Sequence, residues 1–196
     1  MDINDININS DDRDIIDSFI NGNESAFNLL VLKYQKKIYW VIRKMVLEHD
    51  DADDIVQEVF IKLYKSLKDF RGESSFYTYI YKIAVNYSLN HIKKKKNVTS
   101  KVINIDDESF KLSSDEKLQD ENYDAASRRI VLKEAIKSLP EQQRAVFSLR
   151  FYENLSYEEI AKILNKSVGG MKANYFHAVK KIEEIIKKKR TNGFIN

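Results

Sequence analysis

The residues best suited to binding chemistry lie on either side of a tight turn in SYEEIAKILNKSVGGMKANYFHAVKKI, which covers residues 156–182. Ser156 and, three residues later, Glu159 fit the capping box that starts a helix, and a second amphipathic pattern follows the turn. Two helices joined in this way are typical of a helix-turn-helix, whose second helix enters the major groove of duplex DNA. The side chains expected to point outward from that second helix are Lys172, Asn174, His177, Lys180 and Lys181.

Two of the chain's five glycines, Gly169 and Gly170, stand side by side where this second helix is expected to begin. Small residues at the N-terminal end of a recognition helix let its backbone and its dipole approach a phosphate. The other interpretation is that one glycine only eases the turn, at some cost in helix propensity. We favour the first interpretation.

A second candidate site is the acidic start of a helix in DDADDIVQEVFIKLYKSL, residues 50–67. Capping and the helix dipole explain one or two acidic residues before an apolar run, but this run contains more. An acidic helix face with an exposed aromatic side chain suits docking of a basic partner helix. A divalent-metal site would need converging oxygen ligands, and no second acidic cluster or histidine spacing supplies them. The acidic run is Asp50, Asp51, Asp53 and Asp54, and Gln57 and Glu58 extend its polar face beside Phe60.

A third candidate site is FRGESSFYTYIYKIAVNYSLNHIKKKK, residues 70–96, which interleaves aromatic rings with basic and amide side chains. Rings that stack on unpaired bases and cations that hold the backbone are what binding of single-stranded nucleic acid requires. Phe76, Ile80 and Ile83 have the spacing of core residues. Because successive helical positions cannot all face inward, we expect some of the tyrosines Tyr77, Tyr79, Tyr81 and Tyr87 to be exposed.

The elements that must position these residues are expected to be helices throughout, since the 196-residue chain has one proline and five glycines to punctuate turns. Apolar residues recur at helical spacing, and no strand is expected. There is no cysteine, so neither a disulfide framework nor a thiolate metal site is expected. No apolar run is long enough to span a membrane, and the acidic N-terminus is unlike a signal peptide. A cytoplasmic protein is expected. The helical patterns cover residues 12–20, 24–47, 52–67, 76–92, 128–138, 141–152, 156–165 and 168–190.

The fold class predicted is therefore all-α, with two helical domains joined by an acidic linker. Residues 1–96, an antiparallel helical bundle, are electrically neutral overall, with 15 basic and 15 acidic side chains. Residues 97–127 lose the periodicity and carry a net charge of −5, which favours a linker. Residues 128–196, the helix-turn-helix domain, carry a net charge of +8, which favours a nucleic-acid partner.

With these three stretches in this order, the chain closely resembles the extracytoplasmic-function (ECF) sigma factors of bacterial RNA polymerase. DDADDIVQEVF resembles the core-polymerase-binding motif of sigma region 2, and FRGESSFYTYIYKIAVNYSLNHIKK resembles its minus-10 recognition and strand-opening segment. LPEQQRAVFSLRFYENLSYEEIAKILNKSVGGMKANYFHAVKKI resembles sigma region 4. The resemblance covers roughly residues 12–96 and 128–188.

The resemblance implies that the chain binds core RNA polymerase and promoter DNA, is held by an anti-sigma factor, and is not an enzyme. It implies neither a cofactor, nor a metal, nor membrane insertion. The residues implied in binding core polymerase are Asp51, Asp53, Asp54, Gln57, Glu58 and Phe60. Those implied at the minus-10 element are Arg71, Gly72, Ser74, Ser75, Tyr77, Tyr79, Lys82, Asn86, Asn90, Lys93 and Lys94. Those implied at the minus-35 element are Ser167, Gly169, Gly170, Lys172, Ala173, Asn174, Phe176, His177, Lys180 and Lys181.

The sequence departs from the family pattern at three of these positions. Family members often have tryptophan where Tyr79 stands, and arginine where Asn174 and His177 stand. Losing the two arginines weakens phosphate or guanine contacts, whereas an asparagine can read adenine. The minus-35 sequence therefore does not follow from the family.

Two other classes of protein compete with this one. An ordinary helix-turn-helix activator or repressor accounts for residues 128–190 but leaves the acidic helix and the aromatic stretch without a role. A metal-dependent nuclease using the aspartates near residue 50 would need a divalent ion. His49, His91 and His177 do not have the spacing of metal ligands.

Overall fold

The computed structural model describes residues 6–102 and 123–191, and every regular element in these two ranges is a helix. The predicted all-α class is confirmed. Most of the predicted acidic linker, residues 97–127, lies outside the described residues. Its two ends do not: α4 continues to Val102, and the next helix already begins at Tyr123. Where the apolar pattern stops, a helix has no apolar side to pack on a neighbouring element. The helix itself can continue beyond that point, as α4 and α5 do here.

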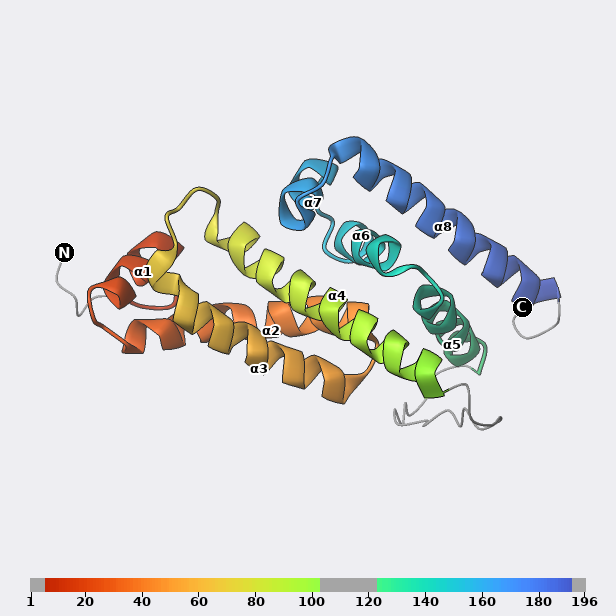
Figure 1. The fold of residues 1–196 in the computed structure, drawn as a ribbon, viewed down its shortest axis with the longest axis horizontal. Helices are drawn as coiled ribbons and strands as arrows, with labels where there is room; N and C mark the ends of the chain where they lie inside the picture. Colours follow the sequence, from red (N-terminus) through yellow and green to blue (C-terminus); the bar gives the residue numbers. More distant parts are fainter. Residues whose placement is uncertain (1–5, 103–122, 192–196) are drawn as a thin grey trace.

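The first domain consists of α1 (Asp12–Ile20), α2 (Ser25–Val46), α3 (His49–Ser66), the short 3-10 helix η1 (Leu67–Asp69) and α4 (Phe76–Val102). Helices α2, α3 and α4 pack against one another, and α1 closes one end of α2 (Figure 1). The apolar positions expected from the spacing form the core. Leu30, Ile38, Val59, Leu63 and Ile80 are all fully buried there.

The second domain consists of α5 (Tyr123–Lys137), α6 (Glu141–Phe151), α7 (Tyr157–Leu164) and α8 (Val168–Thr191). The long helix α8 packs on α5, α6 and α7. The capping box predicted at the start of α7 is present: Ser156 Oγ accepts from the Glu159 amide at 3.2 Å, and Glu159 Oε2 accepts from the Ser156 amide at 2.8 Å. Asn165 ends α7 in the left-handed conformation, with φ of 53°.

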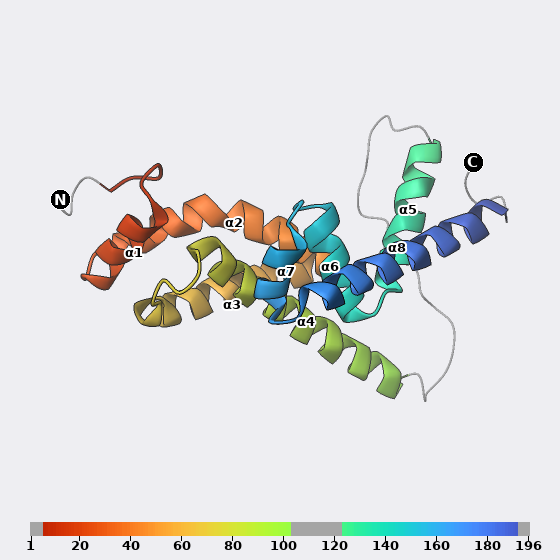
Figure 2. The same ribbon diagram turned by 90° about the horizontal axis from the view of Figure 1, so that it is seen from above.

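The two domains pack directly on each other, which the sequence did not determine. Helices α6 and α7 lie against α4, and α6 also lies against the end of α2. Figure 2 shows α7 over the middle of the first domain, with α5 and the far part of α8 extending beyond it. Leu149 of α6 and Ile160 of α7 are fully buried in the same apolar cluster as the first-domain core.

Arg144 fastens the start of α6 to the end of α2. Its side chain is only 7% exposed, and its guanidinium donates to the backbone carbonyls of Met45 at 3.3 Å, of Leu139 at 3.4 Å and of Lys137. Burial lowers the pKa of the guanidinium, but an arginine remains charged in proteins. One charged donor thus serves three backbone carbonyls.

We expect Arg144→Met to lower the free energy of unfolding by about 3 kcal/mol, because buried carbonyls lose a charged donor while the side-chain volume is kept. Urea unfolding followed by circular dichroism measures the change. The matched control is Arg13→Met, at an exposed position of α1, which is expected to shift the midpoint very little. Equal effects of the two substitutions would contradict the role of Arg144.

Candidate binding surfaces on α3, α4 and α8

The acidic start of α3 divides into an inward and an outward part. Asp51 points toward α4, where its Oδ2 lies 2.7 Å from Lys95 Nζ and 3.1 Å from His91 Nε2. Asp53 and Asp54 are exposed, and Asp53 lies 3.3 Å from His49 Nδ1. Asp51 therefore holds α3 on α4 and is less available to a partner than the sequence indicated.

The outward part continues along α3 as a polar face. Asp54 and Glu58 lie one helical turn apart, with Gln57 between them, and all three are exposed. The expectation that Phe60 is an exposed aromatic side chain is wrong, because Phe60 is only 9% exposed and packs in the core. Phe60 lies on the inward-facing side of α3 together with Val59 and Leu63. The spacing of these apolar residues could have predicted that Phe60 is buried. Ile61, 55% exposed, is the apolar residue beside the acidic face, and sequence reasoning missed it.

The contribution of Asp51 to the free energy of unfolding depends on pH, and the pKa of Asp51 fixes the direction of that dependence. Burial alone would raise the pKa of Asp51, but hydrogen bonds from Lys95 and His91 outweigh burial and hold the pKa below its usual value. A carboxyl whose pKa is lowered on folding stabilises the protein above its unfolded pKa of about 4. That contribution is lost as the pH falls through the lowered value.

We therefore expect the stability difference between the native chain and Asp51→Asn to be largest near neutral pH and to shrink below about pH 4. Urea unfolding of both proteins from pH 7 to the acid limit measures this difference. Titration of the other carboxyls is common to both chains and cancels. A difference that stayed constant across this range would show that Asp51 does not gain its stability from the charged form.

The loop before α4 and one face of α4 form an exposed polar surface. Residues 71–75 are all exposed, and Gly72 has φ of 71°, a conformation that suits glycine. Ser75 Oγ accepts from the Thr78 amide at 3.2 Å, as a helix-capping side chain does. The predicted polar residues along α4 are all exposed, namely Lys82, Asn86, Asn90, Lys93 and Lys94.

The tyrosines of α4 are less accessible than the sequence predicted. Tyr77, Tyr79 and Tyr87 are half-buried, and Tyr81 is 1% exposed. Tyr79 donates from its hydroxyl to Ser66 Oγ at 2.7 Å and packs on Phe70. Tyr77 stacks on Tyr81, with ring centroids 4.0 Å apart. The side of α4 that carries Tyr77 and Tyr81 faces the second domain, which could not be read from helical spacing.

The start of α8 is open to solvent and offers free space at Gly169. Ser167 Oγ accepts from the Gly170 amide at 3.2 Å. Neither Gly169 nor Gly170 has a positive φ, and a Cβ added to Gly169 would meet no atom within 4 Å. A Cβ on Gly170 would lie 3.1 Å from Ser167 Oγ, a tight contact. The turn thus does not require glycine at 169.

The outward residues of α8 are placed mostly as predicted. Two of them are engaged within the protein: Asn174 Nδ2 donates to the Gly170 carbonyl at 2.8 Å, and Lys181 Nζ donates to the Ser138 carbonyl at 2.8 Å. Phe176 is 64% exposed. Together with Lys172 and Lys180, these side chains form a cationic and aromatic face from the second turn to the middle of the helix. The predicted residues that are exposed are Ser167, Gly169, Lys172, Ala173, Phe176, His177 and Lys180.

Two features of the described residues bear on other classes of protein. Among these residues, no group of three or more His, Asp or Glu side chains could hold a metal ion. No helix in the described ranges has both the length and the apolar character needed to cross a membrane.

Comparison with known proteins identifies the family. Residues 30–98 match the model of sigma-70 region 2, and residues 129–182 match that of sigma-70 region 4. The chain belongs to the sigma-70 family of RNA polymerase sigma factors, which are transcription initiation factors. More particularly, it belongs to the ECF group within that family.

Membership of the ECF group rests on sequence identity to known relatives. The chain is 37% identical to the RNA polymerase sigma-H factor of Pseudomonas aeruginosa, over 89% of this chain and 93% of that one. It is also 37% identical to the ECF RNA polymerase sigma-E factor of Escherichia coli K12, over 88% and 92% of the two chains. Promoter-specific initiation with RNA polymerase is thus the function of this chain.

Solved structures share the fold. CnrH, in complex with the cytosolic domain of CnrY, matches with a TM-score of 0.63 at 20% identity, over 90% of this chain and 97% of that one. The sigma factor RpoE of Bartonella quintana, in complex with the anti-sigma factor NepR, matches with a TM-score of 0.61 at 20% identity, over 82% and 96%. These likenesses confirm the two-domain sigma architecture.

Proposed function

We propose that the two domains divide promoter recognition between them. Residues 1–96 bind core polymerase through α3 and open and hold the non-template strand at the minus-10 element through α4 and the loop before it. Residues 128–196 read the minus-35 duplex with the start of α8. The observation that carries the proposal is that one chain exposes an acidic helix face, a polar face beside it, and an open helix N-terminus on a helix-turn-helix.

Each surface has the chemistry its role requires. The face of Asp54, Gln57 and Glu58 presents negative charge and amide groups to a basic helix of the polymerase. The exposed asparagines and lysines of α4 can hold bases and phosphates of a melted strand, and the loop with Gly72 lets a flipped base approach the backbone. No step of covalent chemistry is assigned to the chain.

Further partners belong to the same proposal. Two of the solved relatives are complexes with an anti-sigma factor or with the cytosolic domain of another protein. We infer that this chain too is held by an anti-sigma factor until a signal releases it. Its work on promoter DNA places it in the cytoplasm.

The test is to mix the purified chain with bacterial core polymerase, run gel filtration, and transcribe fragmented genomic DNA with the complex. Co-elution together with new, discrete start sites is the expected result. Failure to bind a competent core, with tight binding to palindromic duplex DNA as a homodimer, would instead establish a free helix-turn-helix regulator. In that case residues 51–60 would lose their proposed role in binding polymerase.

A further inference from the structure

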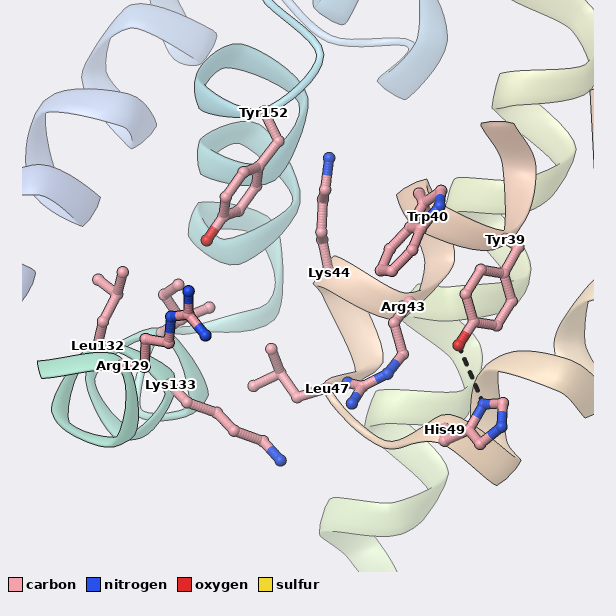
Figure 3. A pocket seen from close by; sticks show the side chains of 11 residues that line it. Tyr39, Trp40, Arg43, Lys44, Leu47, His49, Arg129, Leu132, Lys133 and Tyr152 are labelled. Atoms are coloured by element: carbon pink, nitrogen blue, oxygen red, sulfur yellow. Dashed lines mark hydrogen bonds between the residues drawn. The ribbon is translucent and has the colours of Figure 1, made fainter. Parts of the chain in front are cut away.

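A groove opens to solvent beside the end of α2, and none of the residues assigned above to polymerase or DNA binding lines it. Figure 3 shows its two walls, one from α2 and the other from α5 together with Tyr152. Leu47, which follows α2, lies between the walls and packs in the buried cluster of the second domain. The volume of this α2–α5 groove is about 500 Å³. That volume suits a small molecule, since such sites measure about 300–1,000 Å³.

The lining of the α2–α5 groove carries charge of one sign. No aspartate or glutamate is among the described residues that line it. A cleft of one charge sign between low-dielectric walls focuses its field and raises the local concentration of counter-ions. The groove therefore attracts an anion. Its cationic lining residues are Arg43, Lys44, Arg129 and Lys133.

Acidic side chains nearby neutralise only part of this charge. Lys44 Nζ lies 3.0 Å from Glu153 Oε1 and is engaged there. Lys133 Nζ lies 3.9 Å from Glu48 Oε1, and both of these side chains are largely open to solvent, so the pair is weak. Arg43 has no side-chain hydrogen bond, ion pair or ring contact with any described residue. Its guanidinium is therefore available as a donor to a ligand.

A half-exposed aromatic ring stands beside Arg43. Trp40, the single tryptophan of the chain, lies about one helical turn before Arg43 on α2, so the two side chains share a face of the helix. The ring is 48% exposed. Tyr39 holds it edge to face, with ring centroids 5.3 Å apart, and the Tyr39 hydroxyl is itself paired with His49 Nδ1 at 3.0 Å. The indole thus has a supported orientation and an open area on which a ligand can stack.

We propose that the α2–α5 groove binds a nucleoside polyphosphate, with its base stacked on Trp40 and its phosphates held by Arg43 and the cations of α5. A flat ring is the partner that an exposed indole favours. Guanidinium groups suit phosphate oxygens, to which they donate two parallel hydrogen bonds. Both features act on one ligand only if it carries a ring and several negative charges. This small-molecule site goes beyond the promoter recognition proposed above and does not depend on it.

Other anions use the groove less fully. Inorganic phosphate leaves the indole without a partner. An acidic peptide docks through several anchors that are spaced along a helix or a strand, whereas this groove has the volume of a single small ligand. The nucleotide is therefore the class of ligand that matches the ring, the charge and the size together.

Trp40 reports binding directly, because the chain has no other tryptophan. Titration of the full chain with ATP and with GTP at physiological ionic strength should quench its emission saturably, and calorimetry should show a single bound nucleotide per chain. Tripolyphosphate has the charge without the ring, and adenosine has the ring without the charge. Each should bind about tenfold more weakly than ATP, or weaker still. Equal binding of ATP and either fragment would overturn the proposal, and so would a failure of both nucleotides to bind.

Substitutions in the groove locate the bound nucleotide. Arg43→Gln removes the charge but no side-chain contact with the described residues, and it should weaken ATP binding by about tenfold or more. Its matched control is Lys36→Gln, which removes one charge at an exposed position of α2 outside the groove and should bind ATP as the native chain does. Trp40→Leu, followed by calorimetry, should lose about tenfold in affinity, as expected for one stacked base. Equal affinities of Arg43→Gln and Lys36→Gln would overturn the site.

The surfaces that are proposed to bind DNA are cationic too, so their share of nucleotide binding must be measured. Lys172→Glu with Lys180→Glu leaves the lining of the groove unchanged and should keep nearly the native affinity for ATP. Loss of ATP binding in this variant, with normal binding by Arg43→Gln, would place the nucleotide on α8 and overturn the proposal. A glutamate-rich peptide with one phenylalanine that quenched Trp40, where ATP and GTP did not, would overturn it in favour of a protein partner. None of these measurements uses polymerase or promoter DNA, so failure of the nucleotide site and failure of the proposed function are distinguishable.

Discussion

A chain with Asp54→Lys and Glu58→Lys is expected to lose co-elution with core polymerase while keeping its fold. Both carboxylates are exposed on one face of α3, so their replacement removes no internal contact. Placing two like charges against a basic surface costs several kcal/mol, and every 1.4 kcal/mol is about tenfold in affinity. We therefore expect binding to weaken by about 100-fold or more.

The control for this variant carries the same change in net charge elsewhere. Asp14→Lys with Asp17→Lys reverses two exposed aspartates of α1 and is expected to co-elute with polymerase normally. Asp51 is unsuitable for this experiment, because it contacts Lys95 and His91 of α4 and its replacement would also lower the stability of the fold. Normal co-elution of the Asp54 and Glu58 variant would remove α3 from the proposed polymerase interface.

Local sequence signals predicted the helices and their caps well. Apolar spacing located α2, α3 and the first part of α4, and the Ser156 and Glu159 pair located the start of α7. These features depend on residues within about one helical turn of one another, where helical geometry fixes which side chains meet. The exposure of Lys172, His177 and Lys180 follows from the same periodicity.

Features that depend on distant parts of the chain could not be predicted in this way. The acidic run at the start of α3 gave no sign that Asp51 pairs with α4, more than 40 residues away. Tyr81 is buried in a cluster that both domains form, where its hydroxyl meets Glu153, 72 residues along the chain. Leu47 resembles any helix-ending apolar residue until the second domain is placed around it. Tertiary contacts, which local patterns do not encode, decide each of these cases.

Charge reversal at Lys172 in the second turn of α8 and at Lys180 near its middle is expected to have the other large effect. Lys172→Glu with Lys180→Glu should lower transcription from native promoters by about 10- to 100-fold, because each lost phosphate contact weakens DNA binding and each new carboxylate repels the backbone. Polymerase binding should persist, since α3 is unchanged. Run-off transcription at matched concentrations of the polymerase complex measures the effect. Asn174→Ala should matter less, because the Asn174 amide already donates to the Gly170 carbonyl.

The far end of the same helix supplies the matched control. Lys187→Glu with Lys188→Glu makes the same change in charge near the last turn of α8, away from the end that is proposed to enter the major groove. If DNA recognition is localised at the start of α8, this control should transcribe nearly as well as the native chain. Equal losses from both pairs would instead indicate that α8 contributes only general positive charge. Its start would then not be a recognition surface, and close approach of DNA would no longer explain the glycine at position 169.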